Sequence, residues 1–439
     1  MDSASRVLEL LNHGPQSAKT LCTSLGVSQP TVSRLIARLS DKVVRFGRGR
    51  STHYCAVAEG SYSTPLYCVD EKGQVQELAQ FIPLKLGHYL LTQIQADTPF
   101  WLLGANGNGY YEDLPFFLDD LRPQGFLGRQ IATHLSKIKP YPNDPRHWNA
   151  QQIVRYLTEE GYDLPGNLLL GEQALQLFLI SNPAVVKVRD DDYLLLSKQA
   201  LSDGVPGSSA GGEQQKFTAY TADKGHVIVK FSSAADSPEA QRWRDLIFSE
   251  HIALTLLREN GMTTAEHQVY EFEGRVFLES QRFDRSGLSG RLPMISLSVI
   301  DAEFVGHGLN WVNIGERLFK QGLLSHNDFQ NIVFFHTFGQ WINNTDMHLG
   351  NISLKPGKRD FSLYPLYDML PMGFVIRQGE EVQRPFHAPV QTIVNKDVWQ
   401  TCGTLSTIYW QRVIEDHRIS DNFKNIAKKQ CAQIKETLK

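Results

Sequence analysis

Cysteine is scarce in this sequence, and long apolar runs are absent. The 439 residues include only Cys22, Cys55, Cys68, Cys402 and Cys431, and they contain no C-x-x-C motif or Cys/His cluster. This scarcity excludes a disulfide scaffold and structural zinc, and it favours a reducing, cytoplasmic compartment. No stretch approaches 18 uninterrupted apolar residues, so neither a membrane span nor a membrane partner is expected.

A strong overall charge is missing as well. With 41% hydrophobic and 21% charged residues, the composition is that of ordinary folded proteins, which excludes a disordered or collagen-like chain. The length suits about two to four domains. The net charge of −3 is uneven, because residues 1–57 carry +5 and the remainder carries −8. A basic segment on an acidic body indicates that only the first segment meets a polyanion.

The basic segment has the pattern of a winged helix-turn-helix. Residues 18–25 predict a helix that Ser17 caps and Gly26 ends, and Ser28 caps the next helix. Five apolar positions are spaced so that these two helices interlock: Leu21, Leu25, Val27, Val32 and Leu35. The stretch VVRFGRGRSTHYCAV (43–57) then predicts a strand, a basic turn and a second strand.

Polar side chains on the third helix are left facing outward by this register. They are Gln29, Thr31, Ser33, Arg34 and Arg38. The neutral side chains can reach base edges, and the arginines of this helix can reach phosphates or guanine. Arg48 and Arg50 on the wing would enter a minor groove or contact the DNA backbone. We expect residues 1–58 to bind DNA, and a homodimer to strengthen this binding. The alternative is a protein-interaction module with a solvated basic face.

Two pieces of a nucleotide phosphate site follow in the second half of the chain. The stretch DGVPGSSAGGEQQKF (203–217) holds closely spaced glycines, including Gly211 and Gly212, whose backbone N–H groups can approach phosphate oxygens. By itself such a stretch is more often a flexible linker. The next predicted strand, GHVIVKFS (225–232), carries Lys230, which can neutralise phosphates. Glu250 lies on a predicted helix, from which it can orient that lysine.

Two further pieces carry carboxylates and an amide. Asp346 and Asn351 have the D-x-x-x-x-N spacing found in the catalytic loop of protein kinases, with Asn344 and Thr345 where kinases have His-Arg. Asp346 can orient or deprotonate an attacking hydroxyl. Asn351 and Asp368 can together bind Mg²⁺ that bridges the phosphates. Each piece alone is weak, but their order along the chain is that of a kinase site.

These motifs resemble the HipA serine/threonine kinases, which are toxins of bacterial toxin–antitoxin systems. The resemblance rests on SAGGEQQK (209–216), VIVK (227–230), SQRFDR (280–285), NNTDMHLGN (343–351) and LYDML (366–370). It implies an α+β chain with a two-lobed, kinase-like domain. We therefore expect a winged helix-turn-helix at 1–58, a β-rich subdomain at 59–185, an ATP-binding small lobe at 186–285 and a mainly helical catalytic lobe at 286–439.

The resemblance also implies roles for single residues, with ATP and Mg²⁺ as cofactors. Asp346 would be the catalytic base, Asn351 and Asp368 the Mg²⁺ ligands, and Lys230 a phosphate ligand. His348 would support this site. The stretch 279–283 would be the adenine hinge, with Gln281 and Phe283 nearest the base. The remaining implied site is autophosphorylation at Ser209 or its neighbour Ser208, which would add negative charge to a loop that cradles phosphates.

The resemblance bears on partners too. Family targets are aminoacyl-tRNA synthetases, although no residue here identifies the substrate. HipA kinases usually bind a separate helix-turn-helix antitoxin, HipB. A DNA-binding module in the same chain argues against such a partner and favours autoregulation in cis, with nucleoid association when DNA is bound. A role in growth arrest or persistence is implied by the family.

Two other functions are compatible with the same residues. One is a transcriptional regulator whose kinase-like part senses nucleotide with little kinase activity. The other is a metal-dependent DNA nuclease in which Asp346, Asn351 and Asp368 hold the metal. The nuclease hypothesis leaves Lys230 and the Gly-rich stretch without a role.

Overall fold

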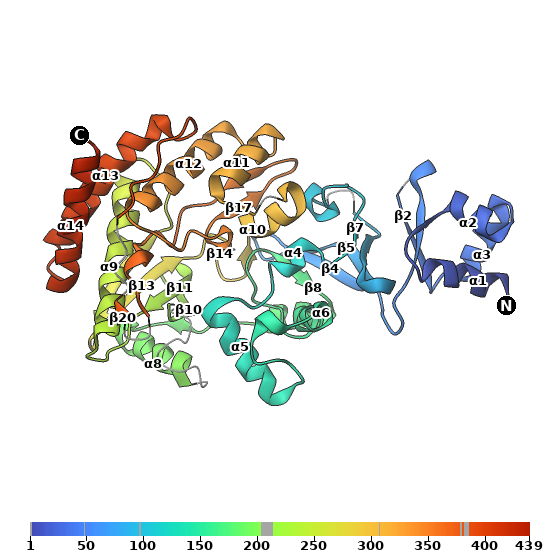
Figure 1. The fold of residues 1–439 in the computed structure, drawn as a ribbon. Helices are drawn as coiled ribbons and strands as arrows, with labels where there is room; N and C mark the ends of the chain where they lie inside the picture. The colour runs from blue at the N-terminus through green and yellow to red at the C-terminus, as the bar shows by residue number, and fades with distance from the viewer. Residues whose placement is uncertain are drawn as a thin grey trace.

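The chain folds into a small N-terminal module, a β-rich middle region and two lobes that share one large core (Figure 1). The computed structural model describes residues 2–47, 49–95, 98–202, 214–306, 308–377, 380–381 and 386–439. Within these ranges, no helix is long and apolar enough to cross a membrane.

The N-terminal module contains three helices and a three-stranded sheet. They are α1 (Ser3–Leu11), α2 (Ala18–Leu25), α3 (Gln29–Arg38), β1 (Gln16–Ser17), β2 (Val43–Phe46) and β3 (His53–Ala56), with strand order β1-β3-β2. The Ser17 hydroxyl accepts a hydrogen bond from the Thr20 N–H at 3.0 Å, and Gly26 ends α2 with a φ of 65°. Ser28 stands at the N-cap of α3 as predicted, but its hydroxyl bonds Thr31 instead of a backbone N–H.

The apolar positions predicted to interlock do form the core of this module. Leu21, Val32 and Leu35 are buried, and Leu25 and Val27 pack against them. The strand–turn–strand prediction is confirmed by the antiparallel pairing of β2 with β3.

The middle region is a five-stranded antiparallel sheet covered by helices. Its strands are β4 (Thr64–Val69), β5 (Val75–Pro83), β6 (Tyr89–Thr92), β7 (Tyr110–Tyr111) and β8 (Leu168–Leu170), in the order β7-β6-β5-β4-β8. Its helices are α4 (Phe116–Asp119), α5 (Gly125–Ile138), α6 (Ala150–Glu159) and α7 (Glu172–Ile180). A turn at Lys72–Gly73 joins β4 to β5, and Gly73 has the positive φ (80°) that such a turn requires.

The small lobe is built on a second five-stranded sheet, of order β12-β13-β11-β10-β9. Its elements are β9 (Val185–Val186), α8 (Arg189–Ser202), β10 (Lys216–Thr221), β11 (Gly225–Phe231), α9 (Pro238–Glu259), β12 (His267–Phe272) and β13 (Arg275–Gln281). Successive side chains of a strand point to opposite faces of the sheet, so the two faces pack against different partners. Phe217, Val229 and Phe277 join Tyr193 of α8 in one apolar cluster. The opposite face carries Lys230 and Leu278 toward α9 and the large core.

The large lobe is mainly helical, with short strand pairs at its border with the small lobe. Its helices are α10 (Leu297–Ile300), α11 (Trp311–Lys320), α12 (His326–Trp341), α13 (Lys396–Glu415) and α14 (Asp421–Thr437), with a π-helical turn at Asp301–Val305. Its strands are β14 (Arg285–Ser286), β15 (Gly290–Arg291), β16 (Ile295–Ser296), β17 (Ser353–Pro356), β18 (Phe361–Leu363), β19 (Ile376–Arg377) and β20 (Glu380–Glu381).

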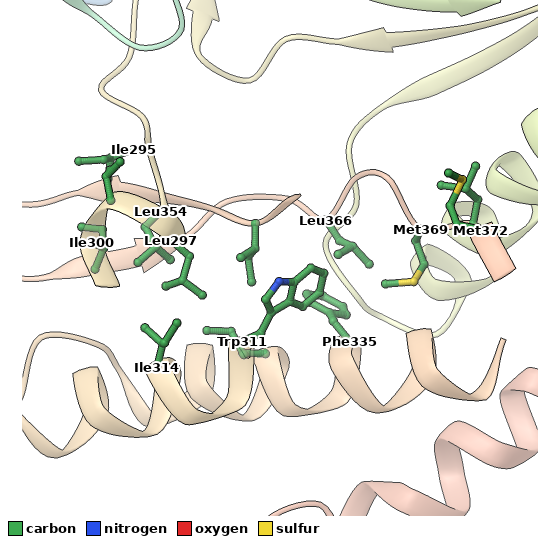
Figure 2. Packing of buried hydrophobic residues seen from close by; sticks show 14 of the residues in the cluster. Ile295, Leu297, Ile300, Trp311, Ile314, Phe335, Leu354, Leu366, Met369 and Met372 are labelled. Atoms are coloured by element: carbon green, nitrogen blue, oxygen red, sulfur yellow. The ribbon is translucent and has the colours of Figure 1, made fainter. Parts of the chain in front are cut away.

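The core of this lobe supports the loop that carries Asp346. Trp311 and Phe335 project from the helical layer toward Leu354 and Leu366, as Figure 2 shows. Met369, which directly follows Asp368, is fully buried in the same cluster. The segments that bear the predicted site residues are therefore anchored to a packed apolar layer.

Candidate active site

Lys230 lies at the centre of the site, between two carboxylates from different elements. Its ammonium group donates to Glu250 Oε1 at 2.6 Å and to Oε2 at 2.8 Å, and it also donates to Asp368 Oδ1. Lys230 comes from β11, Glu250 from α9 and Asp368 from the segment after β18. The structure thus brings together three predicted residues that span 138 positions of the chain.

Burial makes this contact strong. Glu250 is 1% exposed and the side chain of Lys230 is 9% exposed. Burial alone would lower the pKa of Lys230, but Asp368 and Glu250 together outweigh it and raise that pKa above its ordinary value. Burial alone would likewise raise the pKa of Asp368, yet Lys230 holds it below its usual range. Both groups are therefore charged near neutral pH.

The predicted D-x-x-x-x-N loop folds back on itself. The Asn351 amide Nδ2 donates to the backbone carbonyl of Asp346 at 2.7 Å, so the two ends of the motif are joined. Because the amide nitrogen makes this bond, the amide oxygen of Asn351 points away from that carbonyl. The half-buried carboxylate of Asp346 lies in the same loop, which directly follows α12.

Asn344 connects this loop to Asp368, and sequence reasoning gave it no role. Its side chain accepts from the Asp346 N–H at 3.1 Å and donates to the Asp368 carbonyl at 3.2 Å. Asp368 has a φ of 53°, in the left-handed region that a non-glycine residue seldom occupies. Asn344 is 5% exposed. The place of Asn344 just before Asp346, where kinases carry His-Arg, was the signal available in the sequence.

His348 and Trp311 complete the loop. The indole N–H of Trp311 donates to the His348 carbonyl at 2.9 Å, and the ring Nδ1 of His348 accepts from the Gly350 N–H at 3.1 Å. His348 is exposed and lies close enough to Asp368 to help lower the pKa of that carboxyl. The supporting role of His348 stays a prediction.

The predicted adenine hinge lies at the end of β13. The amide of Gln281 donates to the Lys224 carbonyl at 3.0 Å, and its backbone N–H donates to the Glu266 carbonyl. The ring of Phe283 stacks on Tyr364, with 4.6 Å between ring centroids. Both side chains are half-buried and stand where the small lobe passes into the large lobe.

A second lysine on the same sheet was also missed. Lys216 on β10 is the register partner of Lys230 on β11. Directly opposite residues of an antiparallel pair project from the same face. Accordingly, Lys216 acts electrostatically on both Glu250 and Asp368. The hairpin spacing of the two predicted strands was the signal that could have found it.

The residues fit a magnesium ion that also binds phosphates. Mg²⁺ prefers hard oxygen ligands and usually takes only one or two from the protein, with water and phosphate supplying the rest. The Asp368 carboxylate and the Asn351 amide oxygen are such ligands. No group of three or more His, Cys, Asp or Glu side chains arranged to hold a metal is found in the part of the chain that the structure describes. The site would thus depend on the nucleotide for its remaining ligands.

Several predicted residues lie outside the described part of the chain. They are Ser208, Ser209, Gly211, Gly212, Arg48 and the side chain of Arg50. On α3, the side chains of Gln29, Ser33, Arg34 and Arg38 are exposed as predicted. Thr31 is only partly exposed, and its hydroxyl forms a hydrogen bond with that of Ser28 at 3.0 Å.

The fold and the site define a kinase-like protein, in which a sheet-based lobe supplies a Lys–Glu pair and a helical lobe supplies the Asp, Asn and Asp residues. Residues 208–438 match the family model of the HipA-like C-terminal domain, and residues 60–179 match that of the YjjJ-like toxin, middle domain. Toxin YjjJ of Escherichia coli (strain K12) is 35% identical over 444 residues, covering 98% of each chain. The chain belongs to the HipA family of toxins.

Two solved structures resemble this fold at low sequence identity. HipA from the Shewanella oneidensis MR-1 toxin–antitoxin system, solved with HipB and operator DNA, has a TM-score of 0.48 and 15% identity, covering 73% of this chain and 83% of that chain. The Helicobacter pylori proinflammatory kinase CtkA has a TM-score of 0.36 and 11% identity, covering 51% and 88%.

Proposed function

We propose that this toxin is an ATP- and Mg²⁺-dependent protein serine/threonine kinase that binds DNA through residues 1–58. The observation that carries the kinase proposal is the buried contact of Lys230 with both Glu250 and Asp368. A lysine fixed by a helix carboxylate next to a metal-binding Asp is what phosphoryl transfer needs for positioning and charge neutralisation.

The residues have separate roles in this proposal. Lys230 binds nucleotide phosphates and Glu250 orients it. Asn351 and Asp368 hold Mg²⁺, which when bound neutralises charge on the phosphates. Asp346 accepts the proton of the attacking serine or threonine hydroxyl. Gln281 and Phe283 meet the base, and Ser208 or Ser209 is the site of autophosphorylation.

The DNA-binding proposal is supported by the exposed α3 face and by the net charge of +5 in residues 1–57. We propose that α2 and α3 form the helix-turn-helix, with α3 in the major groove and the β2–β3 turn as the wing. Under this proposal the chain is divided into four domains or subdomains, at residues 1–58, 59–185, 186–285 and 286–439. A homodimer would place two such modules on one operator.

Intact mass after incubation with ATP and Mg²⁺ tests the kinase proposal. We expect the wild type to gain phosphate at Ser208 or Ser209 and the Asp346→Asn variant to gain none. The protein is first treated with a phosphatase, so that a pre-existing modification cannot hide the gain. No gain in either protein would contradict the kinase proposal. Plasmid nicking with Mg²⁺ and no ATP would instead favour a nuclease.

A further inference from the structure

The segment that joins the two lobes packs against the middle region of the chain. This interlobe crossing, residues 282–294, runs from the end of β13 to the start of β16 and contains the short β14–β15 hairpin. In the proposed function it follows directly on Gln281 and includes Phe283. The position of the crossing therefore decides how the hinge side chains face a nucleotide.

The start of the crossing is held by a buried cluster of ion pairs. The side chains of Arg282, Asp284 and Arg285 are 8%, 4% and 3% exposed. Asp284 pairs with both arginines, at 2.9 Å to Arg282 Nη2 and at 2.6 Å to Arg285 Nη1. Two guanidinium groups against one buried carboxylate leave an unbalanced positive charge inside the protein, which is costly unless a further anion approaches.

The middle region supplies that anion. Asp163, in the loop between α6 and β8, has its Oδ1 at 2.8 Å from Arg285 Nη2 and at 3.6 Å from Arg282 Nη1. The same loop adds backbone groups. Arg285 donates to the carbonyls of Leu164 at 2.7 Å and Gly166 at 3.1 Å, and the Gly166 N–H donates to Asp284 Oδ2 at 2.9 Å.

The remainder of the crossing is also fixed from the middle region. The Arg291 N–H donates to the Asp70 carbonyl at 2.9 Å, and the Arg291 guanidinium lies 4.6 Å from the ring centroid of Phe178. Just past the crossing, Ser296 of β16 donates its N–H to Asp120 at 2.8 Å and its hydroxyl at 2.6 Å. The middle region thus contacts the crossing at its beginning and at β15, and it contacts the strand that follows.

We propose that the middle region is a structural part of the nucleotide site, in which Asp163 acts as a positioning residue by holding the interlobe crossing through Arg282 and Arg285. This inference rests on the proposed function, since it concerns how Gln281 and Phe283 are presented to a nucleotide. It assigns to residues 60–179 a role in the affinity of the kinase site for its cofactor.

The Asp163→Asn substitution in the full-length protein tests this inference. Its side chain is 42% exposed, so the neutral and nearly isosteric amide can be accommodated in the fold. Glu159→Gln is the matched control, because it removes carboxylate pairs with Lys139 and Arg155, at 2.8 Å each, within the middle region. The readouts are amide hydrogen exchange across 282–294, the dissociation constant of ADP with Mg²⁺, and the melting temperature.

We expect faster exchange across the crossing and about fivefold weaker ADP binding in Asp163→Asn, while Glu159→Gln matches the wild type. Asp163→Glu keeps the charge but displaces the carboxylate, so it should change both values in the same direction as Asp163→Asn and by a smaller amount. Unchanged exchange would overturn the inference, and so would faster exchange with unchanged ADP binding. If Asp163→Asn fails to fold, the same criteria apply to Asp163→Glu, whose longer side chain displaces the carboxylate.

A different result would contradict the proposed function. If the wild type binds no nucleotide, the kinase proposal is contradicted and the positioning role of Asp163 falls with it. Exchange across 282–294 would still show whether Asp163 holds the crossing. In a protein that does bind ADP, the comparison of Asp163→Asn with Glu159→Gln addresses Asp163 alone.

Discussion

Lys216 lies directly opposite Lys230 in the antiparallel register of β10 and β11, so the two ammonium groups project from one face of the sheet. Lys230 is already bound by two carboxylates. No hydrogen bond or ion pair joins the Lys216 side chain to another residue within the described ranges. A nucleotide entering the site would therefore meet Lys216 as a second positive charge for its phosphates.

Replacing Lys216 by Met should weaken the binding of ADP by about tenfold and leave the binding of adenosine nearly unchanged, since only ADP carries phosphates. Titration calorimetry with each ligand measures both constants. Lys216→Arg keeps the charge and should bind ADP nearly as well as the wild type. Lys187→Met, which removes an exposed lysine next to β9, is the control. Equal ADP affinity in Lys216→Met and Lys187→Met would contradict this role.

Asn344 allows a test of how the catalytic loop is held. Its amide bonds both the Asp346 N–H and the Asp368 carbonyl. The Asn344→Ala substitution should lower the rate of phosphoryl transfer by about 10- to 100-fold, because misplaced reacting groups lose the benefit of orientation. The neighbouring Thr345 is exposed, so Thr345→Ala should leave the rate unchanged. Single-turnover kinetics at saturating ATP measure this, and equal rates in both variants would refute the expectation.

The sequence predicted the elements of this site better than the contacts among them. The strand with Lys230 and the helix with Glu250 both form where the sequence predicted them. The strand has apolar residues at alternate positions, the helix is a long run without an internal glycine or proline, and each site residue lies within one element. The contact of Asp368 with Lys230 joins positions 138 apart. No local pattern encodes such a contact: the order of the motifs predicted that both residues belong to one phosphate site, but not that they touch.

Other features depend on how separate segments pack, and they could not be predicted locally. The Asp163 contact with Arg285 joins residues 122 positions apart. The motif SQRFDR is part of the resemblance to HipA kinases, but the sequence does not indicate which residue pairs with its charged side chains. In the N-terminal module, by contrast, the wing prediction required only two neighbouring strands and a turn. The local sequence is sufficient to predict these two strands and the turn. It does not predict how they pack on the middle region, where Phe46 stacks on Tyr110 with 4.5 Å between ring centroids.

The exposed arginines of α3 allow a test of DNA binding. If Arg34 and Arg38 contact phosphates, each replacement by Ala should reduce the salt dependence of binding, lowering the slope of log K against log salt concentration by about 0.9. Arg6→Ala removes the same charge from the exposed side of α1, which the proposed docking leaves away from the groove. Fluorescence anisotropy with a labelled duplex at several salt concentrations measures the slopes. Equal slopes for all three variants would indicate general charge attraction without docking of α3.

His336 should make the protein sensitive to moderate acid. Burial lowers the pKa of this side chain on α12 to about 4, from 6.5 for an exposed histidine. Between these two values the unfolded chain binds a proton that the folded chain does not, so stability falls as the pH falls through this window and is unaffected above it. From pH 7 to pH 5, one such histidine costs about 2 kcal/mol of unfolding free energy.

The His336→Phe variant keeps a ring of similar size beside Trp311 and removes the titration. It should therefore lose about 2 kcal/mol less than the wild type between pH 7 and pH 5, as measured by urea unfolding at each pH. His326→Phe, at the exposed first turn of the same helix, should lose as much as the wild type. If His336→Phe and the wild type lose stability equally, the half-buried ring of His336 is not what makes the large lobe sensitive to acid.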